Sequence, residues 1–298
     1  MMSMKNFTIN DLERFSGIKA HTLRVWERRY ALVKPIRSPG NFRLYTLDEL
    51  KKILNIALLK KNGYRISVLS KIKARDIEDK IEQLSSDNIK WQKAINDLTI
   101  NMYTLQPESF EWVLDELLLH WPIDILVEKI IFPFLTVTHL LWTGNKLSEK
   151  HLVVTAIRKK LIFAIESSGL ISTRNEPVLL FLPDRKQLDL GLLYCNYYLK
   201  RRGIKVLYLG NDVSIQNLKN IFHELTLSYL FTYLPQDHAF QTEQLLECMS
   251  LYAPNCKLII GKYCYQPIDN IHAESLIYMD FANALEFLHK SIRAISLI

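Results

Sequence analysis

Residues 8–45 of this 298-residue chain read TINDLERFSGIKAHTLRVWERRYALVKPIRSPGNFRLY, and they carry its strongest local signals. Thr8 or Asn10 stands where a helix N-cap belongs, and Ser16-Gly17 then interrupts the helical pattern. A second helix is expected over residues 19–30, with three apolar side chains on one face: Leu23, Trp26 and Tyr30. Two short helices around a tight glycine-containing turn are typical of a helix-turn-helix.

A hairpin is expected directly after the second helix. Ser38-Pro39-Gly40-Asn41 predicts a turn between two short extended arms. Such a hairpin, or wing, lays basic side chains along a nucleic-acid backbone beside the helix. Thr46 then begins a further helix, because Asp48 and Glu49 occupy its first turn. We predict that this head contacts double-stranded DNA through eight side chains: His21, Thr22, Arg24, Arg28, Arg37, Asn41, Arg43 and Tyr45.

Charge is divided unevenly along the chain. Residues 1–75 hold 17 Lys and Arg against 5 Asp and Glu, a balance of +12, whereas the whole chain has a net charge of +7. The remainder is therefore mildly acidic. A basic module of this size favours a polyanionic partner, and nucleic acid is the leading candidate. The alternative for Arg24 and Arg28 is a surface salt bridge with Glu27 or Glu13.

Composition bounds the remaining classes of protein. Apolar residues make up 49% and charged residues 23%, which is ordinary for a globular chain of about two domains. No apolar run approaches the roughly 18 residues of a membrane span, and the N-terminus has no apolar signal segment, so we expect a cytoplasmic protein without a membrane partner. The four cysteines form no CxxC pair, which predicts reduced thiols and no metal site.

The rest of the chain predicts two further domains. Residues 76–173 are rich in helical periodicity with short turns, which favours a four-helix bundle. Short apolar runs over 177–182, 205–210, 228–233 and 256–261, with a candidate fifth over 275–278, alternate with helical segments, which is typical of a doubly wound, Rossmann-like sheet. The expected fold is α/β multidomain, with a winged helix-turn-helix over residues 1–75, the bundle over 76–173 and the α/β domain over 174–298.

Two stretches resemble known families. Residues 8–67 resemble the MerR-type winged helix-turn-helix through the TLRxWERRY motif, the wing and the helix that follows. This resemblance implies a bacterial transcription regulator that binds a pseudo-palindromic operator as a dimer. Residues 177–218 and the bundle resemble the cobalamin-binding region of methionine synthases and light-responsive MerR regulators.

The cobalamin motif is altered in this sequence. In that family a Glu/Asp-x-His-x-x-Gly loop follows the first strand, and its histidine binds the cobalt. Counting back from Gly191, Leu188 occupies the histidine position and Lys186 the acidic one. Light-sensing relatives also cover the cofactor with a Trp and a Glu-His pair. The resemblance therefore implies a degenerate pocket of Trp142, His151, Leu188, Gly191 and Gly261, and we expect neither a cofactor nor a metal.

The sequence favours a cobalamin-independent regulator that self-associates as a dimer or tetramer. Two alternatives stay open: a cobalamin-dependent light-sensing repressor that tolerates the loss of the axial histidine, and a different small molecule or protein effector in the same cleft. Three tyrosines of one helix are candidates for a protein-binding surface, or for the core: Tyr194, Tyr197 and Tyr198. An enzyme is not expected, because the sequence has no nucleophile elbow, Walker loop, HExxH motif or catalytic carboxylate pair.

Overall fold

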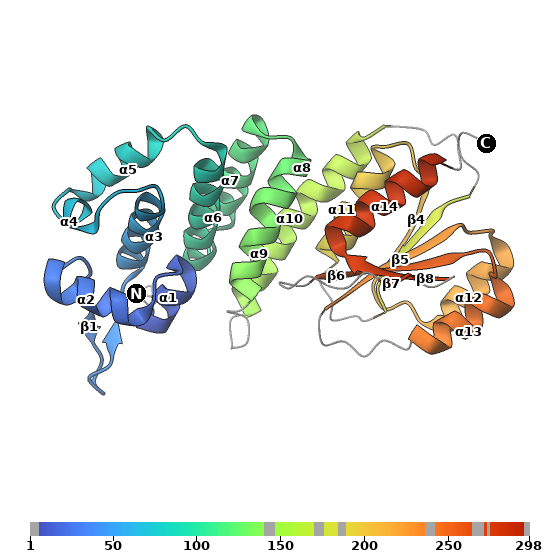
Figure 1. Ribbon diagram of the computed structural model, residues 1–298, viewed down its shortest axis with the longest axis horizontal. Helices are drawn as coiled ribbons and strands as arrows, with labels where there is room; N and C mark the ends of the chain where they lie inside the picture. The colour runs from blue at the N-terminus through green and yellow to red at the C-terminus, as the bar shows by residue number, and fades with distance from the viewer. Residues whose placement is uncertain are drawn as a thin grey trace. The chain divides into compact units, whose positions relative to one another are not determined.

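The computed structural model of the chain divides into two compact units, residues 1–156 and 157–298 (Figure 1). It describes residues 6–139, 147–169, 176–183, 189–235, 242–263, 271–272 and 275–294. Within these ranges no helix is both long and apolar enough to cross a membrane.

The first unit begins with a small winged domain. Its elements in chain order are α1 (Ile9–Ser16), α2 (Ala20–Tyr30), β1 (Ile36–Arg37), β2 (Arg43–Leu44), α3 (Leu47–Lys61), α4 (Ile66–Leu69) and α5 (Ala74–Glu82). α3 begins where the sequence predicts, because the Thr46 side chain accepts the backbone N–H of Glu49. Six apolar side chains of this helix form its buried face: Leu50, Ile53, Leu54, Ile56, Leu58 and Leu59.

Helices make up the remainder of the first unit. They are α6 (Asp87–Thr104), α7 (Pro107–His120), α8 (Ile123–Ile125), the π-helix η1 (Leu126–Ile131), α9 (Phe132–His139) and α10 (Leu147–Ser167), which continues past residue 156. The π-helix lies directly before Pro133, and the Phe132 N–H donates to the carbonyl of Val127. A proline has no N–H and its ring crowds the carbonyl four residues back, so a wider turn at this point relieves the clash.

An aromatic cluster ties the winged domain to α6. Phe7 and Tyr45 exchange two backbone hydrogen bonds of 2.8 Å, which pins the chain before α1 to the end of the wing. The Phe7 ring lies edge-on to Tyr103 of α6, with ring centroids 5.0 Å apart, and both rings also contact Phe15. All three side chains are buried, so this cluster is a hydrophobic joint between α1, the wing and α6.

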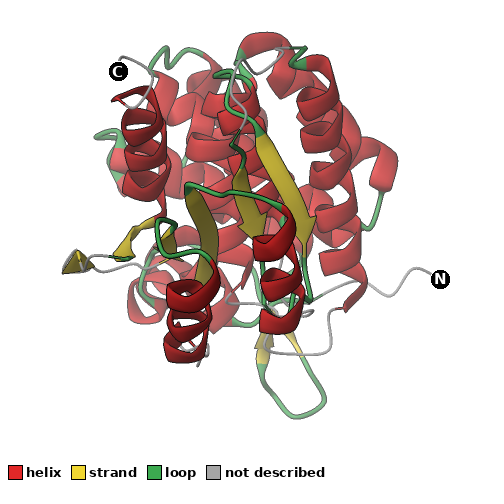
Figure 2. Cartoon of the chain, turned by 90° about the vertical axis from the view of Figure 1, so that its right-hand side faces the viewer, coloured by secondary structure: helices red, strands yellow, loops and turns green. Residues whose placement is uncertain are grey.

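The second unit is built on a six-stranded sheet in the order β4-β3-β5-β6-β8-β7 (Figure 2). The strands are β3 (Val178–Phe181), β4 (Val206–Gly210), β5 (Tyr229–Pro235), β6 (Lys257–Tyr263), β7 (Ile271–His272) and β8 (Leu276–Asp280). Five strands run parallel, and only β7 pairs antiparallel to its neighbour β8. The sequence predicts the five parallel strands; β7 is an addition too short to carry its own pattern.

Helices cover both faces of this sheet. α12 (Ile215–Glu224) and α13 (Thr242–Tyr252) pack on one face over a core that includes Leu179, Leu230 and Leu258. α11 (Leu190–Lys200) and α14 (Phe281–Ala294) contact each other and pack on the strands from the other side (Figure 1). The chain crosses from β4 back over β3 to β5, so the carboxyl ends of β3 and β5 form the point at which the winding reverses. In open α/β sheets such a point is where ligands bind.

Candidate nucleic-acid interface and cofactor-binding edge

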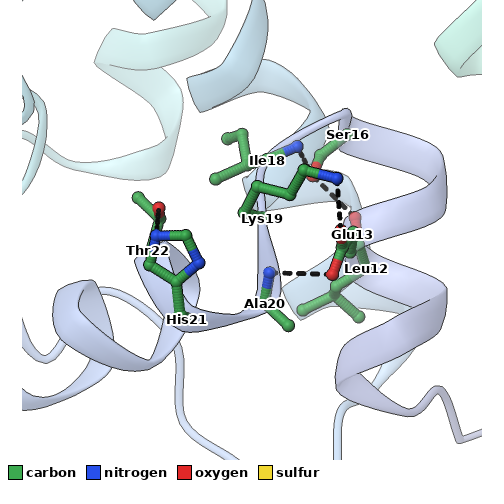
Figure 3. Close-up of polar contacts among 8 residues, drawn as sticks. All are labelled: Leu12, Glu13, Ser16, Ile18, Lys19, Ala20, His21 and Thr22. Atoms are coloured by element: carbon green, nitrogen blue, oxygen red, sulfur yellow. Dashed lines mark hydrogen bonds and ion pairs between the residues drawn. The ribbon is translucent and has the colours of Figure 1, made fainter.

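The turn between α1 and α2 is held by side chains of α1 (Figure 3). Gly17 has φ 69°, a left-handed conformation that glycine adopts without strain. The Ser16 hydroxyl donates to the carbonyl of Leu12 and accepts the N–H of Ile18. These bonds satisfy backbone groups on both sides of the turn, so the angle between the two helices is set locally.

Glu13 of α1 caps the start of α2. Its Oε2 accepts the backbone N–H of Ala20 at 2.9 Å, and its Oε1 lies 3.2 Å from the Lys19 Nζ (Figure 3). The residue at the N-cap position itself, Lys19, gives no side-chain cap. The backbone N–H of Ala20 and the ammonium of Lys19 hold the pKa of Glu13 below its ordinary value. Glu13 therefore does from a neighbouring helix what a Ser or Asp N-cap usually does.

α2 has one buried face and one exposed basic face. Leu23 and Trp26 are buried, whereas His21, Arg24 and Arg28 are exposed. Thr22 is half-buried, and its Oγ1 lies 3.2 Å from His21 Nε2. Among the described residues neither arginine forms an ion pair with Glu13 or Glu27, whose carboxylates have other partners. The helix thus presents its cations to solvent.

The wing hairpin is locked at its tip. β1 and β2 pair antiparallel, with Ile36 opposite Leu44 and Arg37 opposite Arg43. Asn41 has φ 60°, and the Arg37 guanidinium donates to both its Oδ1, at 2.9 Å, and its carbonyl, at 3.1 Å. Phe42 beside it is 73% exposed. Arg37 and Asn41 are therefore brought together at the tip.

One carboxylate of α2 holds the base of the wing. Glu27 accepts from the Arg43 Nε on one oxygen and from the Tyr45 hydroxyl on the other, each at 3.2 Å. Tyr45 is completely buried, and this burial together with the nearby Glu27 charge raises its pKa to about 12. Of the eight predicted DNA contacts, Tyr45 alone has no exposed surface, and Arg43 reaches solvent from within an ion pair.

Only some of the predicted cofactor residues lie in the described part of the chain, and they belong to separate elements. Trp142, Lys186 and Leu188 lie outside the described residues. His151 is an exposed residue of α10. Gly191 and Gly261 lie at the carboxyl edge of the sheet, in α11 and β6. Asp189 precedes α11 and is ion-paired with Arg158 at 2.5 Å, which fixes the start of that helix.

Aromatic side chains of the chain cover both glycines. A Cβ on Gly191 would lie 3.1 Å from the Tyr233 ring, and one on Gly261 would lie 3.4 Å from the rings of Phe231 and Phe281. A glycine serves a cofactor when its bare backbone is open to close approach. Here that space is taken by the protein, so these two residues do not fit the role that the altered motif assigns to them.

The thiols and tyrosines of the described residues form no further site. Cys195, Cys248 and Cys256 are free thiols, and Cys264 lies outside the described residues. In the part of the chain that the structure describes, no three His, Cys, Asp or Glu side chains gather as a metal would require. Tyr194 and Tyr197 are buried and Tyr198 is half-buried. The core alternative therefore holds for two of these three tyrosines.

Sequence reasoning missed the positions that organise both regions. Glu13 and Glu27 were weighed only as partners of Arg24 and Arg28, and Tyr233 was read only as a strand residue. No local pattern distinguishes Glu13 from an ordinary surface glutamate, because its partner lies on the next helix. Tyr233 carried one signal: a large aromatic residue at the end of a strand beside a predicted glycine site.

Comparisons with known proteins agree with this architecture. A family model described as "MerR HTH family regulatory protein" matches residues 7–76. The chain is 25% identical over 228 residues to the HTH-type transcriptional repressor CarH of Myxococcus xanthus, covering 73% of this chain and 75% of that protein. It is 25% identical over 251 residues to the repressor CarA of the same organism, covering 80% and 81%.

A solved structure has a similar fold. The monomethylamine corrinoid protein of Methanosarcina barkeri superimposes with a TM-score of 0.54 at 13% identity, over 67% of this chain and 99% of that one. Residues 7–76 thus match the MerR helix-turn-helix family, and the matches together support a MerR-type transcriptional regulator with a cobalamin-binding-like domain.

Proposed function

We propose that this regulator binds a pseudo-palindromic operator in the cytoplasm as a dimer or higher oligomer, independently of cobalamin. The observation that carries the proposal is the joint presentation of the basic face of α2 and the wing, which Glu27 holds together. A helix flanked by a wing matches a groove with its adjoining phosphates. We assign this interface to a DNA-binding domain over residues 1–75, with a bundle over 76–173 and the α/β domain over 174–298.

Individual roles follow from exposure. His21, Thr22, Arg24 and Arg28 lie on the helix that would enter the major groove, where a guanidinium or imidazole reads base edges or phosphates. Arg37, Asn41 and Arg43 lie on the wing and would contact the sugar-phosphate backbone. Tyr45 was predicted as a further backbone contact. Because it is buried against Glu27, we propose that it contributes by positioning the wing.

Two copies are proposed because one head is small. A single recognition helix reads about one half-site, and two heads related by a twofold axis read a pseudo-palindrome. Doubling the contacts raises specificity by far more than any single side chain supplies. Tyr198 is the one tyrosine of the predicted surface that keeps exposed area for such an interface.

Cobalamin independence rests on the residues that a corrinoid would need. Leu188 has no lone pair to donate to cobalt, and Gly191 and Gly261 are covered by aromatic rings. His151 is exposed at the surface of α10. A cobalamin-dependent light-sensing repressor is the alternative that the experiment below separates.

The test of DNA binding uses the full chain. Duplexes selected from a random pool should converge on an inverted repeat, and the selected duplex should shift the protein in a gel at a stoichiometry of at least two chains. No convergence of the selected sequences would overturn operator binding. Convergence on a single half-site would overturn the dimer.

The test of cobalamin independence uses the same protein. We would mix it with adenosylcobalamin in the dark, separate it on a sizing column and record the spectrum of the protein peak. A colourless peak of unchanged size supports the proposal. A coloured peak whose size changes on illumination would establish the light-sensing alternative instead.

A further inference from the structure

The carboxyl edge of the sheet carries a pair of aromatic rings, one of which lies on a strand at the point where the winding reverses. Tyr233 lies near the end of β5, and Phe281 follows the end of β8 as the first residue of α14. Their ring centroids are 5.6 Å apart at 83°, an edge-to-face contact. We call these two side chains the aromatic pair.

The aromatic pair lies between two glycines. The Tyr233 ring sits against Gly191 at the start of α11, and Phe281 sits against Gly261 of β6. Gly261 is also the register partner of Tyr233 across the parallel strands β5 and β6. The Tyr233 ring occupies the room that a side chain at residue 191 would need, whereas a Cβ at residue 261 would make ordinary van der Waals contact with Phe281 and Phe231. The start of α11, the end of β5 and the end of β6 thus converge on these rings.

The hydroxyl of Tyr233 completes the arrangement. The backbone N–H of Gly191, one of the orphan donors of the first turn of α11, hydrogen-bonds to the phenol oxygen. Helix N-termini at this edge of an α/β sheet usually offer such donors to a ligand. Here a side chain of the same chain accepts one of them. Tyr233 keeps part of its surface exposed, whereas Tyr194 on α11 is fully buried.

We propose that Tyr233 and Phe281 are an internal occupant of the ligand position of this fold, so that the domain is filled by its own side chains. This inference rests on the proposed cobalamin independence and names the residues responsible for it. Removing the Tyr233 ring should then leave a preformed, solvent-open site that accepts a phenol from solution. Removing the ring of an ordinary core residue would instead leave a sealed cavity.

The experiment compares Tyr233→Ala with Tyr194→Ala in the full-length protein. The probe is 4-hydroxyphenylacetamide, a phenol ring with a polar amide tail that a sealed apolar cavity rejects, because an unpaired buried amide is costly. Each truncation should lower Tm by about 10 °C. We expect the probe to restore at least about half of that loss in Tyr233→Ala, since a bound ligand stabilises the folded state. It should leave Tyr194→Ala and the ring-preserving Tyr233→Phe unchanged.

Three outcomes would overturn the inference. The first is a folded Tyr233→Ala protein that the probe does not stabilise, because no open site is then left behind. The second is equal stabilisation of Tyr194→Ala. The third is a Tyr233→Ala protein that does not fold even with the probe, which makes Tyr233 part of the essential core. Selected-duplex binding by the unmodified protein is scored separately, so a failure of the proposed function is distinguishable from a failure of the aromatic pair.

Discussion

Glu27 of α2 and Arg43 of β2 form an ion pair of 3.2 Å across sixteen residues of sequence, and the second Glu27 oxygen accepts the hydroxyl of Tyr45. This pair joins the predicted recognition helix to the wing. An acidic side chain facing a DNA-binding surface is costly in net attraction. It is retained here because it sets where the wing points, and this argument leads to the first prediction.

Glu27→Gln should reduce specificity more than affinity. The amide keeps the shape of the side chain but weakens the hold on Arg43, and it removes one negative charge from the basic face. We expect binding to random DNA to stay level or rise, and the ratio of selected-duplex to random-duplex affinity to fall about tenfold, as for one lost specific contact. Competition gel shifts measure the ratio. An unchanged ratio would mean that the ion pair does not position the wing.

Arg24→Ala should weaken binding to the selected duplex and, where its contact is to phosphate, lower the slope of log affinity against log salt by about one. Arg24 is exposed on α2 and free of Glu13 and Glu27, so its charge is available to DNA. The matched control is Lys90→Ala, an exposed cation on α6 outside the head. If both variants bind like the unmodified protein at every salt concentration, the assignment of Arg24 is wrong.

Glu13→Gln should lower Tm at neutral pH by an amount that disappears in acid. The pKa of Glu13 is lower in the folded chain than its ordinary value of 4.5, because its carboxylate accepts the N–H of Ala20 and pairs with Lys19. A depressed folded-state pKa contributes stability above pH 4.5, and that stability is lost as the pH falls through the folded value. The Tm difference between the two proteins, measured at pH 7 and below pH 4, tests this. A difference that is constant with pH would contradict the capping role.

Phe7→Ala should destabilise the first unit by about 3–5 kcal/mol, as truncations of buried phenylalanines do. The ring is 1% exposed and contacts Tyr103 and Phe15. Phe163→Ala is the control, because that ring is 74% exposed and its loss should cost less than about 0.5 kcal/mol. Urea unfolding of both variants gives the comparison. Equal small losses would show that the aromatic joint does not stabilise the head.

Much of the architecture could be predicted because its signals are local. Caps at Thr8 and Thr46, the Gly17 turn and the Asn41 tip each act over a few residues, and the structure has all four. The five parallel strands were expected for the same reason, since each is a short apolar run bounded by helical segments. The edge strand β7 has only two residues, too few for any pattern.

The candidate sites also contain features that local sequence patterns predict and features that they do not. The sequence by itself determined which side chains form the exposed basic face of α2, because a helical period and an apolar stripe place Arg24 and Arg28 opposite Leu23 and Trp26. It also determined that Leu188 replaces the cobalt ligand of the family it resembles.

The tertiary structure alone decided which of these residues contact one another. Glu13 caps the helix after its own, Glu27 reaches the wing, and Tyr233 covers Gly191 only once α11 is packed on β5. These contacts join residues that are distant in sequence, and their partners depend on helix packing and strand register. A side chain's type limits what it can bond. Its neighbours in the folded chain decide which of those bonds it makes.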